Sequence, residues 1–213
     1  MQPAPQEPPS QGKDVIKPGA GARSTSTPGS RFPARKCEES RLAGKDLILD
    51  PSSYDLDHVL ADIEVIRRYN PQRFEMEHLT AIVYDDVASG ICAGYKDITP
   101  GEFWVRGHMP GMPLMPGVIM CEAAAQLCAY FVQRHNLMDG KMLGFGGLDQ
   151  VRFRGTVVPG DRLVIVSEKL QLRPGAMIRS RFQCFVGEQR VCEGEIRGIP
   201  IPIEALTGKT EPS

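Results

Sequence analysis

The feature that most constrains the fold is a proline-rich loop that runs directly into an apolar segment, GHMPGMPLMPGVIMCEAAAQ at residues 107–126. Its prolines exclude a helix before Pro116, because proline fixes φ and lacks an amide hydrogen. Residues 118–132 contain no glycine or proline and include four alanines with Leu127 and Met120, which predicts a helix. A helix that is apolar on nearly every side is buried, so the remaining chain must fold around it.

Three polar residues interrupt this helix. Glu122, Gln126 and Tyr130 recur at a spacing of four and therefore form one stripe. A carboxylate in such a helix costs several kcal/mol unless another group uses it. The position of Glu122 on this helix therefore predicts that its carboxylate is either functional or paired with a cation.

Composition and charge limit the classes of function. A chain of 213 residues allows one domain with extensions or two small domains. A net charge of -1 does not favour nucleic acid or an anionic membrane as a partner. Six cysteines without a CxxC pair indicate small buried hydrophobes in a reducing compartment, rather than disulfides or a metal site. No apolar stretch reaches membrane length and no apolar signal core is present, so we predict a cytoplasmic protein.

The domain boundaries follow from the polar ends. Residues 1–45 carry seven of the 18 prolines and few apolar residues, which predicts a disordered tail. A transit peptide is the alternative for this tail, and its acidic residues argue against that. We expect the folded domain at 46–203 and a flexible tail at 204–213.

The first periodic segment predicts an amphipathic helix with Asp55 as its N-cap, ended by Asn70 and Pro71. Its apolar positions at helical spacing are Leu56, Val59, Leu60, Ile63 and Ile66.

Strand patterns flank the buried helix. Residues 79–86 and 91–98 predict a hairpin with its turn at 87–90. Four further strands are expected at 143–155, with a break at Gly146 and Gly147, and at 162–172, 178–186 and 190–199. An antiparallel sheet wrapped around one apolar helix is an α+β architecture, and this arrangement is the hotdog fold.

The central stretch resembles the signature GHFPxxPxxPGVLxxEAxAQ of the beta-hydroxyacyl-acyl-carrier-protein dehydratases of FabZ type. The interval from His108 to Glu122, all three prolines and Gly117 match it. VRFRGTVVPGDRL at 151–163 is also similar to that family, and the resemblance spans residues 69–199, about three fifths of the chain.

The chain departs from the family pattern at two places. It has Met109 where the family has Phe, and NPQRFEMEHLTAIVYDD at 70–86 where the family has an HRFPFLLVDR-like segment. In the family that segment helps line the substrate entrance and the dimer surface. A sister group that also isomerises the double bond has Asp and Trp at the positions of Glu122 and Ala125, so the residues here favour simple dehydration.

The resemblance implies roles for individual residues. His108 is the expected base, since histidine titrates near neutrality. Glu122 is the expected acid if its apolar helix raises its pKa, either directly or through an ordered water. The N–H of Gly117, at the helix start, is expected to bind the thioester oxygen. Met109 is assigned to substrate binding. Gln126 is also assigned to substrate binding. It can in addition orient Glu122 or satisfy backbone groups.

The resemblance also implies partners. No metal or cofactor is expected, and the substrate arrives on the phosphopantetheine of an acidic acyl carrier protein, which Arg152, Arg154 and Arg162 would suit. The assembly is expected to be a homodimer or a trimer of dimers, with each active site shared between two chains.

Competing interpretations remain open. His108 alone could be structural, and Glu122 could pair with a buried arginine. A hotdog thioesterase or a non-catalytic acyl-binding subunit could share the fold. We expect His58 and His135 to be solvated. For His78 the sequence predicts only a position in a loop or at the start of a strand.

Overall fold

The computed structural model describes residues 46–201. The tails predicted at 1–45 and 204–213 lie outside the described residues and remain predictions. Within 46–201, no helix is long and apolar enough to cross a membrane.

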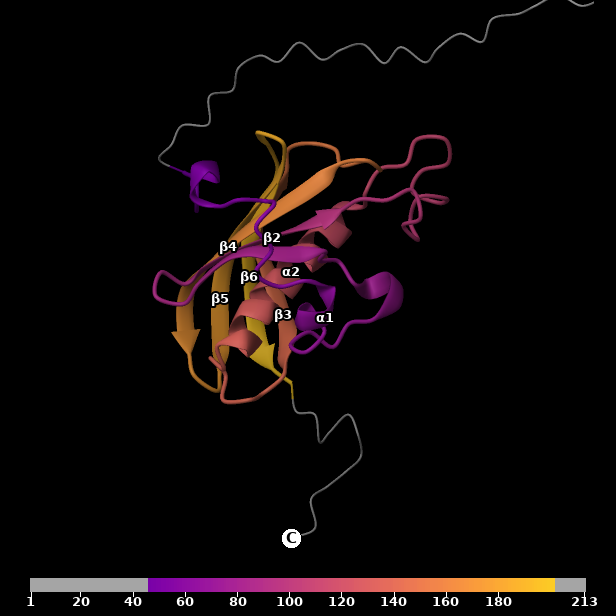
Figure 1. The fold of residues 1–213 in the computed structure, drawn as a ribbon. Helices are drawn as coiled ribbons and strands as arrows, with labels where there is room; N and C mark the ends of the chain where they lie inside the picture. Colours follow the sequence, from indigo (N-terminus) through magenta and orange to yellow (C-terminus); the bar gives the residue numbers. More distant parts are fainter. Residues whose placement is uncertain (1–45, 202–213) are drawn as a thin grey trace, which may run out of the picture. The chain divides into compact units, whose positions relative to one another are not determined.

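A six-stranded antiparallel sheet and one long helix form the framework of the described chain, as the sequence predicted (Figure 1). The strand order is β1-β2-β4-β5-β6-β3. The elements are two 3-10 turns, η1 (Pro51–Ser53) and η2 (Phe74–Met76), the helices α1 (Ile63–Ile66) and α2 (Gly117–Arg134), and the strands β1 (Ala81–Asp86), β2 (Ile91–Asp97), β3 (Leu143–Phe153), β4 (Arg162–Arg173), β5 (Met177–Val186) and β6 (Gln189–Pro200).

Helix α2 packs against the sheet and contacts β2, β3, β4, β5 and β6 (Figure 1). Leu127, at its centre, is fully buried, and burying such a side chain contributes about 1.5–3 kcal/mol. Gly94 in β2 permits the close approach, because a Cβ there would lie 2.6 Å from the Ala81 carbonyl oxygen and 3.2 Å from Leu127 Cδ1. The predicted buried helix is confirmed.

A second apolar cluster joins the start of the described chain to β1, β2, β4 and β5, and no sequence pattern indicated it. Its buried members are Ile48, Ala81, Val83, Ala93, Tyr95, Val164, Val166 and Phe185. The backbone N–H of Ile48 donates a 3.0 Å hydrogen bond to Gln183 Oε1, and Arg190 pairs with Asp46 at 2.7 Å. Residues 46–49 therefore belong to the folded domain.

The predicted amphipathic helix is wrong for residues 55–62. Helix α1 covers only Ile63–Ile66, and its cap is Asp62, whose Oδ1 accepts from the Val65 N–H at 3.0 Å. Upstream, Ala61 forms an antiparallel bridge with Ile82 of β1. The N–H groups of Leu60 and Ala61 both donate to the Ile82 carbonyl oxygen, so at these two residues the sheet edge replaces the hydrogen bonds of a helix.

The hairpin and the later strands are confirmed. Gly90, in the turn before β2, has a φ of +75°, which glycine adopts without steric conflict. β3 shows the expected irregularity, a register shift between Phe145 and Gly147, and then continues to Phe153.

Cysteine usage also matches the prediction within the described residues. Cys92, Cys121, Cys128, Cys184 and Cys192 are buried free thiols. Cys37 lies outside the described residues.

Candidate active site

Three hydrogen bonds hold His108 in the loop between β2 and α2. The His108 N–H donates to the Trp104 carbonyl oxygen at 2.8 Å. The Leu114 N–H donates to the His108 carbonyl oxygen at 2.9 Å, and His108 Nδ1 lies 2.9 Å from the Leu114 carbonyl oxygen. Because a carbonyl oxygen only accepts, Nδ1 carries the hydrogen and Nε2 is the basic nitrogen of the neutral ring. The His108 side chain is exposed in a single chain.

The base of this loop contains a buried ion pair. Lys96 Nζ lies 3.1 Å from Glu102 Oε1, with side chains 10 % and 9 % exposed. Lys96 also donates to the Glu77 carbonyl oxygen at 3.3 Å. The pair ties β2 to the segment that leads to His108. No sequence pattern indicated this pair, since a lysine in a strand gives no local sign of burial.

Gly117 is the first residue of α2, and Pro116 before it provides no side-chain cap. Helix geometry leaves the Gly117 N–H without an intrahelical acceptor, as an anion or oxyanion site requires. A Cβ at Gly117 would lie 2.7 Å from the Phe153 ring of β3. Glycine at this position therefore lets β3 pack against the start of α2.

Glu122 is half-buried and is held by Gln126, one helical turn later. Gln126 Nε2 donates to Glu122 Oε1 and to the Met76 carbonyl oxygen, both at 2.8 Å. Gln126 Oε1 accepts from the His78 N–H at 2.9 Å. Gln126 thus does both things left open by the sequence: it contacts Glu122 and satisfies backbone groups. Both hydrogens of its Nε2 are engaged, so it has no free donor for a substrate.

His78 is a site residue whose position the sequence did not indicate. Its side chain is fully buried, and neither ring nitrogen has a hydrogen-bond partner within residues 46–201. Burial, with the nearby Lys96 cation, lowers the pKa of His78 to about 4, although Glu102 acts in the opposite direction. The ring is therefore neutral at pH 7.

Met109 lies in the same exposed loop as His108. Met109 is 42 % exposed, and its backbone exchanges two hydrogen bonds with Met112. In the described residues His108 and Glu122 form no hydrogen bond with each other. Among the same residues, no group of three or more His, Cys, Asp or Glu side chains could hold a metal ion.

The three arginines expected to contact an acyl carrier protein differ in their ion pairs and in the exposure of their side chains. Arg162 pairs with Asp97 at 2.6 Å and lies 4.0 Å above the Tyr95 ring. Arg154 pairs closely with Glu193, whereas the Arg152 side chain is 64 % exposed and 3.9 Å from the same carboxylate. Arg152 is therefore the most available cation of the three.

The two other histidines are placed differently. His58 is exposed, as predicted. His135 is not simply solvated: its side chain is 22 % exposed, and its Nε2 lies 2.7 Å from Asp85 Oδ1. Asp85 belongs to β1, so the residues near His135 in the sequence do not indicate this contact.

Known protein families and relatives identify the family to which this chain belongs. Residues 70–195 match the FabA-like domain. The chain belongs to this family.

Two curated relatives are both named 3-hydroxyacyl-[acyl-carrier-protein] dehydratase FabZ. The protein from Pelotomaculum thermopropionicum is 38 % identical over 138 residues, which cover 64 % of this chain and 96 % of the relative. The protein from Clostridium kluyveri is 32 % identical over 134 residues, covering 63 % and 92 %. The FabZ-type resemblance is confirmed.

Solved structures confirm the hotdog fold of this FabA-like chain. The dehydratase heterocomplex ApeI:P from Xenorhabdus doucetiae aligns with a TM-score of 0.56 and 14 % identity, over 68 % of this chain and 97 % of that chain. Cj0977 from Campylobacter jejuni aligns with a TM-score of 0.51 and 16 % identity, over 66 % and 91 %. At these identities the likeness concerns the fold alone.

Proposed function

We propose that this FabA-like protein dehydrates 3-hydroxyacyl thioesters on acyl carrier protein to trans-2-enoyl thioesters in fatty acid biosynthesis. The observation that carries the proposal is the half-buried carboxylate of Glu122, held by Gln126 on a helix that is otherwise apolar. The names of the FabZ relatives support the same reaction and do not favour the thioesterase or the non-catalytic alternative.

His108 is the proposed base. Its Nδ1–H is directed to the Leu114 carbonyl oxygen, which leaves Nε2 to take the α-proton of the substrate. The electron pair of the broken C–H bond then forms the Cα–Cβ double bond. The same carbonyl stabilises the imidazolium that results.

Glu122 is the proposed acid. Its Oε1 accepts a hydrogen bond from Gln126, so the proton of a protonated Glu122 resides on Oε2. Transfer of that proton to the 3-hydroxyl lets the C–O bond break and the hydroxyl leave as water. His108 then releases its extra proton to solvent and Glu122 takes up a proton from solvent, which restores both groups.

The start of α2 is the proposed oxyanion site. The Gly117 N–H and the positive end of the helix dipole would stabilise the negative charge that develops on the thioester oxygen. The reaction as proposed uses these protein groups without a metal or a cofactor of the enzyme.

We further propose that two chains form each active site, in a homodimer or a trimer of dimers. His108 is exposed, and it forms no hydrogen bond with Glu122 among the described residues of one chain. β3 is an edge strand with exposed Phe145, Leu148 and Phe153, whereas the other edge strand, β1, is bridged by Ala61. An open apolar edge is suited to pairing with a second copy.

The substrate would enter on the phosphopantetheine arm of acyl carrier protein, near Met109. Arg152 is the cation best placed for an acidic carrier, because its side chain is largely exposed. A cytoplasmic location is also part of the proposal, and the buried free thiols are compatible with a reducing compartment.

Turnover of enoyl thioesters tests the function. Crotonyl and longer enoyl thioesters are incubated with the protein, and loss of enoyl absorbance together with formation of the 3-hydroxyacyl thioester reports hydration, the reverse reaction. A thiol reagent in a parallel assay reports thioester hydrolysis. Hydration without thiol release is the expected result. Thiol release without hydration would establish a thioesterase, and neither signal would favour the non-catalytic alternative.

A further inference from the structure

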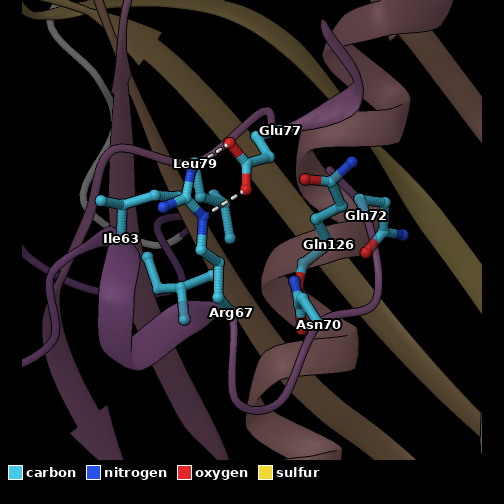
Figure 2. A pocket seen from close by; sticks show the side chains of 8 residues that line it. Ile63, Arg67, Asn70, Gln72, Glu77, Leu79 and Gln126 are labelled. Atoms are coloured by element: carbon cyan, nitrogen blue, oxygen red, sulfur yellow. Dashed lines mark hydrogen bonds and ion pairs between the residues drawn. The ribbon is translucent and has the colours of Figure 1, made fainter. Parts of the chain in front are cut away.

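A small cavity lies beside α2, and residues of α1 and of the segment that joins α1 to β1 line its other sides (Figure 2). Its apolar lining residues are Ile63, Ile66 and Leu79. It leaves about 10 Å³ for the centre of a water molecule, which is room for about one. The polar side chains that line it are Arg67, Asn70, Gln72, Glu77 and Gln126.

The orientation of the Asn70 amide follows from its contact with α2. Asn70 Nδ2 donates to the Gln126 carbonyl oxygen at 2.9 Å, and Asn70 is only 4 % exposed. A carbonyl oxygen cannot donate, so the amide nitrogen must face α2 and cannot be exchanged with Oδ1. Asn70 Oδ1 is therefore a buried acceptor, and no donor reaches it within residues 46–201.

Gln72 also lines this cavity. Its Oε1 is also buried without a hydrogen-bond partner in the described chain. The nearby cation does not serve either oxygen, because Arg67 bonds Glu77 through Nε at 2.6 Å and through Nη2 at 2.9 Å (Figure 2). A buried acceptor without a donor is unfavourable, so both oxygens require a donor from another source.

We propose that this cavity binds one water molecule, which donates one hydrogen bond to Asn70 Oδ1 and the other to Gln72 Oε1. A small cation suits the site less well, because Arg67 also lines it. Water has two donors, which matches the two acceptors.

This water would also position the proposed acid. It ties together residues 70–72, and the same segment continues to Met76 and His78, whose backbone groups hold the Gln126 amide. Gln126 in turn bonds Glu122. Asn70 and Gln72 are thus positioning residues, a step that rests on the proposed function. Both lie in the segment where the chain departs from the FabZ-type sequence pattern.

Crystal structures of the full-length protein and of Gln72→Met test the water site. In the unsubstituted protein we expect one solvent peak within hydrogen-bond distance of both oxygens. Methionine has a similar length but no strong acceptor, so the peak should be absent in the variant. Amides rotated onto protein donors, or a cavity without a peak, would overturn the water site whether or not the protein is a dehydratase.

Kinetics test the positioning step, with Arg68→Met as the matched control on an exposed neighbour that has no side-chain bond among the described residues. In the hydration direction, in which Glu122 accepts a proton from water, we expect Gln72→Met to lower kcat about 5-fold with little change in KM, and to shift the acidic limb of the pH–rate profile. The control should change neither. Loss of the water without these effects would overturn the positioning role, whereas an inactive unsubstituted protein would overturn the proposed function instead.

Discussion

Gln126 lies one turn after Glu122 in α2 and donates a 2.8 Å hydrogen bond from Nε2 to Glu122 Oε1. Its other amide contacts reach the backbone of Met76 and His78. One buried side chain therefore links the proposed acid to the segment before β1, and this link can be broken by substitution.

Gln126→Met should lower kcat by about 10-fold or more, because Glu122 loses the partner that fixes its proton on Oε2. Gln133→Met is the matched control: it breaks another amide-to-carbonyl bond from α2, that of Gln133 Nε2 with Lys141. Steady-state hydration kinetics at a temperature where both variants are folded provide the measurement. Equal losses of kcat in the two variants would contradict a specific role for Gln126.

His108→Ala and Glu122→Ala should each remain folded and lose about 10²- to 10⁴-fold in rate, because each removes a proton-transfer group. If two chains form each site, mixing the two inactive variants should restore activity after subunits exchange. Some heterodimers would then carry one site with both original residues. Heterodimers that form and stay inactive would place His108 and Glu122 in the same chain's site or in no common site.

His78 should make stability depend on pH. Its pKa is about 4 in the folded protein against 6.5 for an unperturbed histidine, so the unfolded chain binds more protons between these values. The free energy of unfolding should therefore fall as the pH drops through this window, by about 3 kcal/mol in total. Denaturant unfolding of His78→Leu should show a weaker dependence, while the exposed His58→Leu control should behave like the unsubstituted protein. Parallel curves for all three would show that His78 does not titrate in this way.

Gly117→Ala should destabilise the protein by about 1–3 kcal/mol, because the added Cβ meets the Phe153 ring at 2.7 Å. In a Phe153→Ala background the same change should be nearly neutral, so a double-mutant cycle measures the contact. Gly107→Ala is the control, since a Cβ there meets no atom within 4 Å. Additive effects of the two substitutions would mean that the clash is relieved elsewhere.

Truncations should locate the start of the folded domain. Removal of residues 1–45 should leave Tm and rate nearly unchanged, because that composition cannot bury a core. Removal of 1–50 should lower Tm by about 3–10 °C, because it deletes the buried Ile48 and its hydrogen bond to Gln183. A large loss on the shorter deletion would assign a structural role to the tail.

The sequence alone determined the features that depend on neighbouring residues. Prolines and glycine end the loop before α2, the absence of breakers predicts α2 itself, and alternation predicts the strands. The interval between His108 and Glu122 identified the family, because such a signature is a local pattern. The fold class and the strand order along the chain were therefore predictable.

Tertiary structure decided the features that depend on partners far along the chain. Residues 55–62 have a helical pattern, but Leu60 and Ala61 bond to Ile82 of β1, since the sheet edge offers backbone hydrogen bonds that replace those of a helix. Ile48 is in the core only because Gln183 and β5 lie beside it. His78 and Gln126 gain their environments in the same way, from segments that are distant in sequence. Burial and hydrogen bonding are set by these long-range contacts, which periodicity within one segment does not contain.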